Sequence, residues 1–212
     1  MMNIPEELAE ECKKRMGDRP VEGFVFGAGP KHPRLMLVGE APGETEIHNG
    51  IPFSGRAGQE LMKFLEGLGL KREDVYITSA VRSRPYKYRD KKNRDGTVEK
   101  KRYNRAPTAA EIKAHAPMLD YEVAHVKSPI IVTLGNIGLK RLAGPSYKVT
   151  EHHGQFLELP VLRLAEEKYE PAEDTRLIFP TFHPASVFYN PGLRGLIEDD
   201  RNKLKSWLDS QK

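Results

Sequence analysis

The chain has 212 residues, of which 38% are hydrophobic and 30% charged, with one cysteine and a formal net charge of +4. This length fits a single domain over residues 1–212, with enough chain to bury a sizeable core. The lone Cys12 excludes an internal disulfide and an all-cysteine metal site. No apolar run reaches the roughly 18 residues of a membrane span, and the N-terminus is unlike a signal peptide. We therefore expect a cytoplasmic protein, a monomer without a membrane partner.

The hydrophobic pattern predicts helices that alternate with short apolar strands. Residues 58–68 follow helical spacing, and a capping box at 108–111 opens another helix that Pro117 is expected to break or kink. The other predicted elements, in chain order, are a helix at 5–16, strands at 34–38, 75–78 and 130–134, a hairpin edge at 155–164, a strand at 177–182 and a helix at 195–208. The alternation predicts an α/β protein, a three-layer α/β/α domain with a mostly parallel sheet of about four strands.

The basic character of the chain comes from one inserted stretch, residues 86–103. It holds eight Lys/Arg and three Asp/Glu, and without it 26 basic and 27 acidic residues remain. Such a cluster is typical of a contact with a polyanion. The alternative is a solvated, disordered loop of charged residues. The residues predicted to contact DNA here are Lys91, Lys92, Arg94, Lys100, Lys101 and Arg102.

Two loops with chemically active side chains follow predicted strands. One is Gly39-Glu40-Ala41-Pro42-Gly43, and the other contains His183-Pro184-Ala185. Because the carboxyl ends of parallel strands meet at one edge of a sheet, a carboxylate and an imidazole can lie together there. Breaking an N-glycosidic bond requires a donor to the departing base, a carboxylate or water near the sugar, and a slot for an extruded base. The pattern favours that chemistry.

Seven motifs occur in the same order as in the uracil-DNA glycosylase superfamily, and the chain most resembles its family 4 enzymes of bacteria and archaea. The motifs are VFGAG at 25–29, LVGEAPGETE at 37–46, GIPFSGRAG at 50–58, VYITSAVRSRP at 75–85, NRAPTAAEI at 104–112, PIIVTLG at 129–135 and TFHPASVFYNP at 181–191. The resemblance implies a monofunctional DNA glycosylase. Such an enzyme flips a pyrimidine, uracil by default, out of single- or double-stranded DNA and hydrolyses its glycosidic bond to leave an abasic site.

The resemblance also implies roles for individual residues. The catalytic set would be Glu40, Glu46 and His183, and the base-binding set Gly39, Ala41, Pro42, Phe53 and Ser79. In the superfamily the loop after the His-Pro motif fills the stack that the flipped base leaves. The loop residues expected to contact DNA here are Ser186, Val187, Phe188 and Tyr189.

This sequence departs from the family pattern at an iron–sulfur cluster. Family 4 enzymes hold the cluster with four cysteines, and Cys12 is at the first of these positions. Arg15, Ser83 and His115 lie at or near the other three. One thiolate cannot hold a cluster that needs four cysteines or a close variant. We expect no cluster, no other cofactor and no metal.

A second departure concerns the base that is read. Ser79 stands where the family has an Asn whose amide reads the pyrimidine edge, and a hydroxyl loses that paired donor and acceptor. This leaves open a glycosylase for a hydroxymethylated or glucosylated pyrimidine in viral DNA, with a role in antiviral defence rather than DNA repair. A non-catalytic DNA-binding module is the other alternative, and the presence together of Glu40, Glu46, Phe53 and His183 argues against it.

Overall fold

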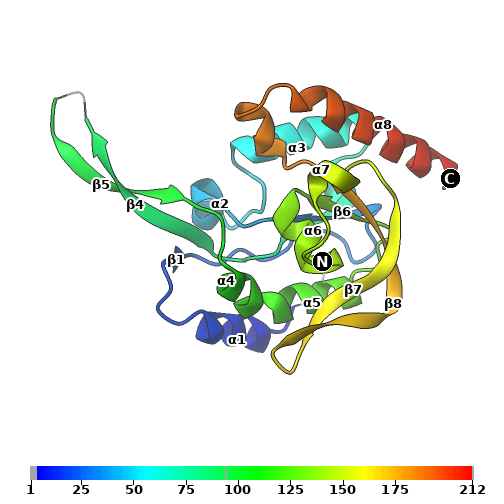
Figure 1. Cartoon of the computed structure of the whole chain (residues 1–212), viewed down its shortest axis with the longest axis horizontal. Helices are drawn as coiled ribbons and strands as arrows, with labels where there is room; N and C mark the ends of the chain where they lie inside the picture. Colours follow the sequence, from blue (N-terminus) through cyan, green and yellow to red (C-terminus); the bar gives the residue numbers. More distant parts are fainter. Residues whose placement is uncertain (1–3, 94, 212) are drawn as a thin grey trace.

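A five-stranded sheet forms the centre of the molecule. The computed structural model describes residues 4–93 and 95–211, and its strand order is β3-β2-β6-β8-β7 (Figure 1). Four of these strands run parallel, β3 (Val75–Ser79), β2 (Leu35–Gly39), β6 (Ile131–Leu134) and β8 (Lys168–Thr181). At the edge, β7 (Leu157–Ala165) pairs antiparallel with β8. The predicted α/β class with a mostly parallel sheet is confirmed.

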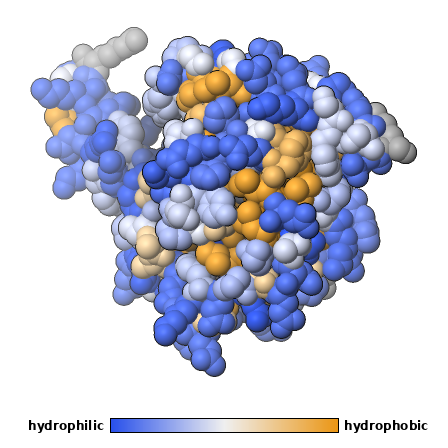
Figure 2. Space-filling view, turned by 45° about the vertical axis from the view of Figure 1, so that its right-hand side comes forward, coloured by the Kyte–Doolittle hydropathy of each residue, from blue (hydrophilic) through white to orange (hydrophobic). Residues whose placement is uncertain are grey.

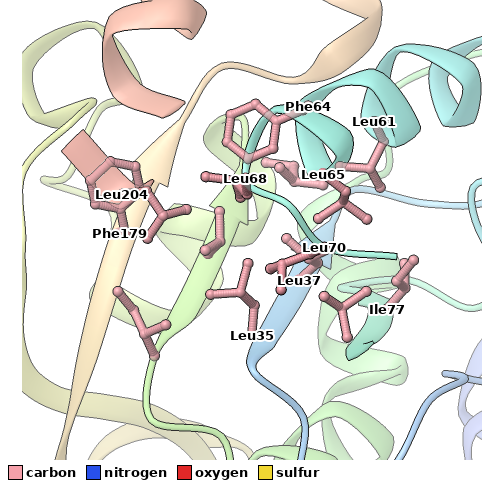
Figure 3. Close-up of a cluster of buried hydrophobic side chains, with 14 of the residues drawn as sticks. Leu35, Leu37, Leu61, Phe64, Leu65, Leu68, Leu70, Ile77, Phe179 and Leu204 are labelled. Atoms are coloured by element: carbon pink, nitrogen blue, oxygen red, sulfur yellow. The ribbon is translucent and has the colours of Figure 1, made fainter. Parts of the chain in front are cut away.

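Both faces of this sheet are buried, which explains why its strands read as continuous apolar runs. Leu35 and Leu37 of β2 pack into a cluster with α3 (Arg56–Gly67) and α8 (Leu193–Ser210), drawn in Figure 3. Met36 and Val38 point to the opposite face, where α5 (Ala116–His125) and α6 (Asn136–Ala143) cover the sheet. Side chains alternate between faces along a strand, so one strand supplies both layers. The helices therefore flank the sheet on two sides, as predicted.

The fifth strand, β7, corresponds to the hairpin edge predicted at 155–164, and it forms a long hairpin with β8. Strand β8 extends over Lys168–Thr181, beyond the predicted 177–182. A two-residue turn joins the strands, with φ of +43° at Glu166 and +65° at Glu167. Turns of this kind usually carry Asn-Gly or Asp-Gly, and a Glu-Glu pair gives no such signal.

The predicted capping box at 108–111 and the predicted helix break near Pro117 are both confirmed. The Glu111 backbone N–H donates to Thr108 Oγ1 at 3.3 Å, and the Thr108 N–H donates to Glu111 Oε2 at 2.8 Å. Helix α4 (Ala109–Ala114) ends at His115, and a new helix, α5, begins after it with Pro117 in its first turn. The remaining helical elements are α1 (Glu6–Met16), α2 (Glu44–Asn49), η1 (Arg72–Asp74), α7 (Val149–His152) and η2 (Pro184–Phe188). In the described part of the chain, none of the helices could cross a membrane.

The basic insertion forms a β-hairpin instead of a disordered loop. Strands β4 (Arg84–Lys92) and β5 (Val98–Asn104) pair antiparallel, and β1 (Val21–Glu22) joins them as a third strand. Near the tip the Asn93 N–H donates to the Thr97 carbonyl at 2.8 Å, and Gly96 takes a left-handed φ of +85°. We call β4 and β5 the arm. It projects from the body in Figure 1, and Figure 2 shows its surface as largely hydrophilic.

Candidate active site

A cavity of about 630 Å³ lies where strands β2, β3 and β8 end. Its wall brings together Glu40, Phe53, Ser79 and His183, which come from four separate segments of the chain. The other predicted residues that line it are Ala41, Pro42, Glu46, Ser186, Phe188 and Tyr189. The placement follows from the topology, because parallel strands present their carboxyl ends at one edge.

Phe53 forms a fixed aromatic wall of the cavity. Its backbone has a left-handed φ of +52°, and Arg72 holds it there by donating to the carbonyls of Pro52 and Phe53. A Cβ on Gly39 would lie 2.5 Å from Phe53 Cζ, and one on Gly58 would lie 1.9 Å from the Phe53 carbonyl oxygen. Both glycines are therefore required for this packing. Gly39 supports the wall from behind and does not line the cavity.

His183 is held as a neutral donor. The Ala185 backbone N–H donates to His183 Nδ1 at 3.1 Å, so the ring proton of the neutral imidazole is on Nε2. Burial lowers the pKa of His183 to about 4, so the ring is uncharged at neutral pH. Its centroid lies 5.8 Å from that of Phe53. The Nε2–H can donate to an oxygen of a base that stacks on Phe53.

Glu40 and Glu46 lie in different environments. Burial raises the pKa of Glu40, and its carboxylate makes no hydrogen bond with the described residues. Glu46 accepts from three backbone N–H groups, Gly43 at 3.0 Å, Ser54 at 3.1 Å and Gly55 at 2.9 Å. Glu46 therefore ties the loop after β2 to the turn that carries Phe53. Glu40 is the carboxylate with free lone pairs to hold a water or face a sugar.

Ser79 presents an acceptor to the cavity. Its hydroxyl donates to the Val81 carbonyl at 2.8 Å, which commits the only proton it has. The remaining lone pairs can accept from an N–H on a base edge. A base carbonyl gains no donor from this side chain.

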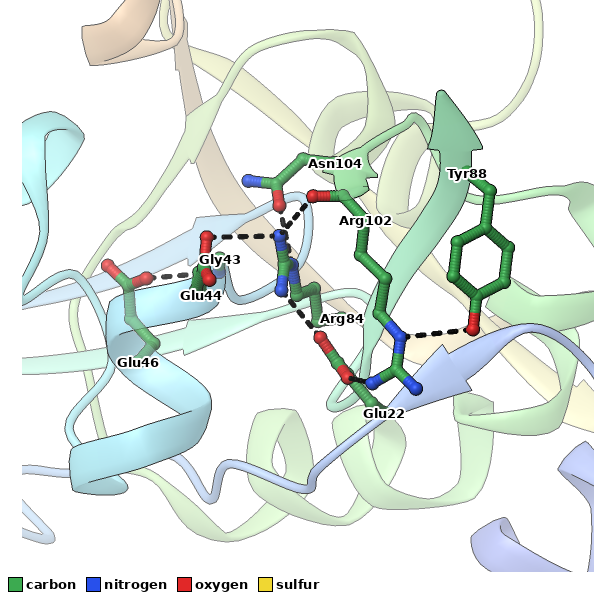
Figure 4. Close-up of polar contacts among 8 residues, drawn as sticks. All are labelled: Glu22, Gly43, Glu44, Glu46, Arg84, Tyr88, Arg102 and Asn104. Carbon is green, nitrogen blue, oxygen red and sulfur yellow. Dashed lines mark hydrogen bonds and ion pairs between the residues drawn. The ribbon is translucent and has the colours of Figure 1, made fainter. Parts of the chain in front are cut away.

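Asn104 lines the cavity at the base of the arm, and sequence reasoning assigned it no role although its motif was recognised. The Arg84 Nε–H donates to Asn104 Oδ1 at 2.6 Å. This bond fixes the orientation of the amide and turns its NH₂ away from Arg84, as Figure 4 shows. The signal available in the sequence was an amide side chain at the end of a highly charged segment, since Asn104 is the last residue of β5.

Comparison with known proteins agrees with this geometry. The model of the Uracil DNA glycosylase superfamily matches residues 26–209. The chain belongs to the uracil-DNA glycosylase superfamily. Type-4 uracil-DNA glycosylases of Sulfurisphaera tokodaii and Saccharolobus solfataricus are each 34% identical to it, over 96% and 99% of this chain and 84% and 88% of theirs. That of Thermotoga maritima is 30% identical over 100% of this chain and 96% of its own. The predicted resemblance is confirmed.

The positions that correspond to the cluster cysteines of family 4 hold an ordinary protein interior. Cys12 is fully buried against Ala9 and Met118. His115 Nδ1 donates to the Glu111 carbonyl at 2.9 Å, and Ser83 Oγ lies 3.3 Å from His115 Nε2. Burial lowers the pKa of His115 to about 4, so the ring is neutral. Because its proton is on Nδ1, Nε2 is the acceptor.

Arg15, near the remaining cluster position, lies at the surface and pairs with Glu11 and Glu167. Among the described residues, no three His, Cys, Asp or Glu side chains are grouped to hold a metal. These side chains do not fit an iron–sulfur cluster: Ser83 and His115 contact each other, Arg15 pairs with carboxylates, and Cys12 packs in a hydrophobic cluster.

The loop after the His-Pro motif divides into a buried and an exposed part. Val187, a residue of η2, is buried and faces away from the cavity. Phe188 lies under the Arg56 guanidinium at 4.5 Å, and the Tyr189 side chain is 89% exposed at the cavity mouth. Phe188 and Tyr189 are thus the members of the predicted loop whose rings are exposed beside the cavity.

The predicted DNA contacts of the arm are exposed cations. Lys91 pairs with Glu99 at 3.2 Å across the hairpin, and Arg102 pairs with Glu22. Lys92, Lys100 and Lys101 are exposed and make no ion pair with the described residues. Arg94 lies outside the described residues.

Proposed function

We propose that the protein is a DNA glycosylase that flips a pyrimidine out of DNA and hydrolyses its N-glycosidic bond. The observation that carries this proposal is the cavity in which Glu40, Phe53 and the neutral Nε2–H donor of His183 meet. The names of the type-4 relatives support it, and so does the family to which the chain belongs. DNA is then the partner, and the product is an abasic site.

Each of the three side chains would have a distinct task in this reaction. The extruded base stacks on Phe53. When the C1′–N1 bond breaks, both bonding electrons leave with the base, and His183 Nε2–H donates to the base oxygen that gains negative charge. Glu40 faces the cationic sugar and accepts the proton of the water that adds to C1′. A carboxylate whose pKa is raised by burial is a better base for that step.

Uracil is the base that we propose by default. A second candidate, a modified pyrimidine in viral DNA, is favoured by one observation, the Ser79 hydroxyl that is committed to Val81. Without an amide at this position, the pyrimidine edge is read less strictly. Antiviral defence depends on this second candidate, and the names of the relatives give it no support.

The test is excision from defined oligonucleotides, single-stranded and duplex, that carry one uracil at a known position. After incubation and heating in alkali, strand cleavage at the uracil is expected, and Glu40→Gln should slow it. Parallel substrates carry 5-hydroxymethyluracil, 5-hydroxymethylcytosine or a glucosylated base. Cleavage only in these would favour the second candidate. No cleavage of any substrate, with DNA binding intact, would leave the non-catalytic binding module as the function.

A further inference from the structure

One face of the arm carries aromatic side chains next to the cavity. In the register of the hairpin, Tyr86 lies opposite Asn104 and Tyr88 opposite Arg102. Directly opposed residues of an antiparallel pair project to the same face, and so do alternate residues of each strand. These four residues therefore share one face, and Asn104 is part of the cavity wall. The tyrosines continue outward from the place where the base would be held.

A chain of polar contacts connects this face to the cavity (Figure 4). Arg84 bonds Asn104 at 2.6 Å and Glu22 at 2.5 Å. Glu22 also pairs with Arg102, whose Nε–H donates to Tyr88 Oη at 3.3 Å. A rigid link of this kind fixes where the arm lies relative to the wall of the cavity.

Tyr86 is half-buried, and Tyr88 is exposed. Their ring centroids are 5.5 Å apart with planes at 79°, and the Arg102 guanidinium lies 4.7 Å from Tyr86 and 5.8 Å from Tyr88. Tyr88 is 55% exposed. Both rings thus contact an arginine, and the Tyr88 ring is open to solvent, so packing in a core does not explain it.

The opposite face of the arm carries one aromatic side chain instead of a pair. The same register places on it Lys87, Arg89, Lys91, Glu99, Lys101 and Tyr103. Four of these six carry positive charge and one carries negative charge. The face with the tyrosines is also basic toward the tip, where Lys92 and Lys100 lie on it together with Asp90. A pair of aromatic rings among cations matches the two parts of a nucleic-acid strand, the bases and the phosphates.

We propose that Tyr86 and Tyr88 form a stacking surface for unpaired bases of the DNA strand next to the extruded nucleotide. The proposal rests on the proposed function for the identity of the strand as DNA. The ligand would be unpaired bases, because the bases of a duplex already stack on one another and expose no face on which a tyrosine ring could stack. The arm then gives this enzyme a preference for single-stranded DNA that does not depend on sequence.

The test measures binding to a 15-residue oligothymidylate and to its duplex with oligodeoxyadenylate, over a range of salt concentrations. Tyr88→Ala should weaken single-strand binding about 5- to 150-fold, with little change for the duplex and the same salt slope. Tyr88→Phe keeps the ring and should keep the affinity. Tyr103→Ala, on the opposite face, is the matched control and should have a much smaller effect.

Equal losses for Tyr88→Ala and Tyr103→Ala, or equal losses on single strand and duplex, would overturn the stacking surface. A flattened salt slope in Tyr88→Ala would also overturn it, because a stacking ring releases no counterions. Tighter binding to a ribothymidylate oligomer of the same length than to oligothymidylate would make RNA the ligand and reject the assignment to DNA. The oligonucleotides of this binding test contain no base to be excised, so the test is independent of the excision assay. If no substrate is excised but single-strand binding still depends on Tyr88, only the glycosylase function is rejected. Excision without Tyr88-dependent binding would reject only the stacking surface.

Discussion

The cavity at the sheet edge and the arm beside it hold their side chains in opposite ways. In the cavity, backbone groups hold two of the polar side chains, as the Ala185 N–H holds His183 and three N–H groups hold Glu46. On the arm, exposed ion pairs do this work, and cations predominate. Backbone contacts are insensitive to salt, whereas exposed charges are screened. We therefore expect the cavity to determine the rate of the reaction and the arm to determine affinity and its salt dependence.

The substitution His183→Ala should separate the effect on reaction rate from the effect on DNA affinity most clearly. A donor to the departing base acts mainly in the transition state, so its loss should lower kcat by about 10²–10³. The dissociation constant for DNA should change little. His32→Ala, at an exposed histidine, is the control. Parallel losses in binding and in kcat would mean that His183 only holds its loop, and the comparison with the arm would fail.

Neutralising the arm should have the reverse effect. Replacing Lys91, Lys92, Lys100 and Lys101 with glutamine should lower affinity for all sequences. The slope of log K against log salt should fall by up to about 0.9 per lost contact on duplex and about 0.7 on single strands. Single-turnover rates at saturating protein should stay near those of the unaltered chain. Substitution of four remote exposed lysines, Lys127, Lys140, Lys203 and Lys205, controls for net charge. An unchanged slope would show that the arm makes no phosphate contacts.

Glu46→Gln tests whether the cavity depends on its backbone contacts. The NH₂ group of the glutamine would face one of the backbone N–H groups that donate to Glu46, and two donors cannot form a hydrogen bond with each other. We expect a loss of about 1.5–3 kcal/mol in unfolding free energy, the usual contribution of bonds to a charged group. The melting temperature should fall by roughly 3–10 °C, and activity should fall with it. Glu66→Gln, at an exposed site on α3, should be silent. A stable Glu46→Gln with normal DNA binding and no turnover would instead make this carboxylate a direct participant in the chemistry.

The exposed loop tip gives a smaller effect that depends on the substrate. Tyr189→Ala, alone or with Phe188→Ala, should slow excision from duplex DNA about tenfold, because a wedge offsets part of the few kcal/mol of unstacking. Excision from single strands should slow less. The measurement is the single-turnover rate on matched single-stranded and duplex substrates. If both substrates slow to the same degree, the wedge role is excluded.

The pH profile should show the smallest change. Because burial raises the pKa of Glu40, its carboxylate is lost as pH falls through a value above the ordinary range of a glutamate. His183, with a pKa of about 4, stays neutral above that limb. We expect kcat/KM to be flat near pH 6.5, where an ordinary histidine titrates, and Glu40→Gln to abolish the acid limb. A limb near pH 6.5 that disappears in His183→Ala would contradict the neutral donor.

The parts of the fold that sequence predicted are those with strong periodic signals. Apolar runs identified β2, β3 and β6, and the Thr108 capping box identified the start of α4. The positions of Glu40 and His183 at one sheet edge followed from parallel topology alone. Helix α2 was missed, because a single turn and a half gives little periodicity. The arm was also missed, since both of its faces are polar and alternation is then invisible.

The distinction between Glu40 and Glu46 could not be predicted. Both are glutamates near one motif, and only the three N–H donors around Glu46 separate their roles. Nor could the sequence show that the Ser79 proton is directed at Val81. Such assignments depend on hydrogen-bond partners supplied by distant segments and by loop conformation.

The contact between Phe53 and Gly39 limits where the ring can lie. The tip of the ring lies so close to the strand backbone that a methyl group on Gly39 would come within 2.5 Å of it. The ring therefore cannot move toward β2, and the position of this wall of the cavity depends on a residue that lacks a side chain and does not line the cavity itself.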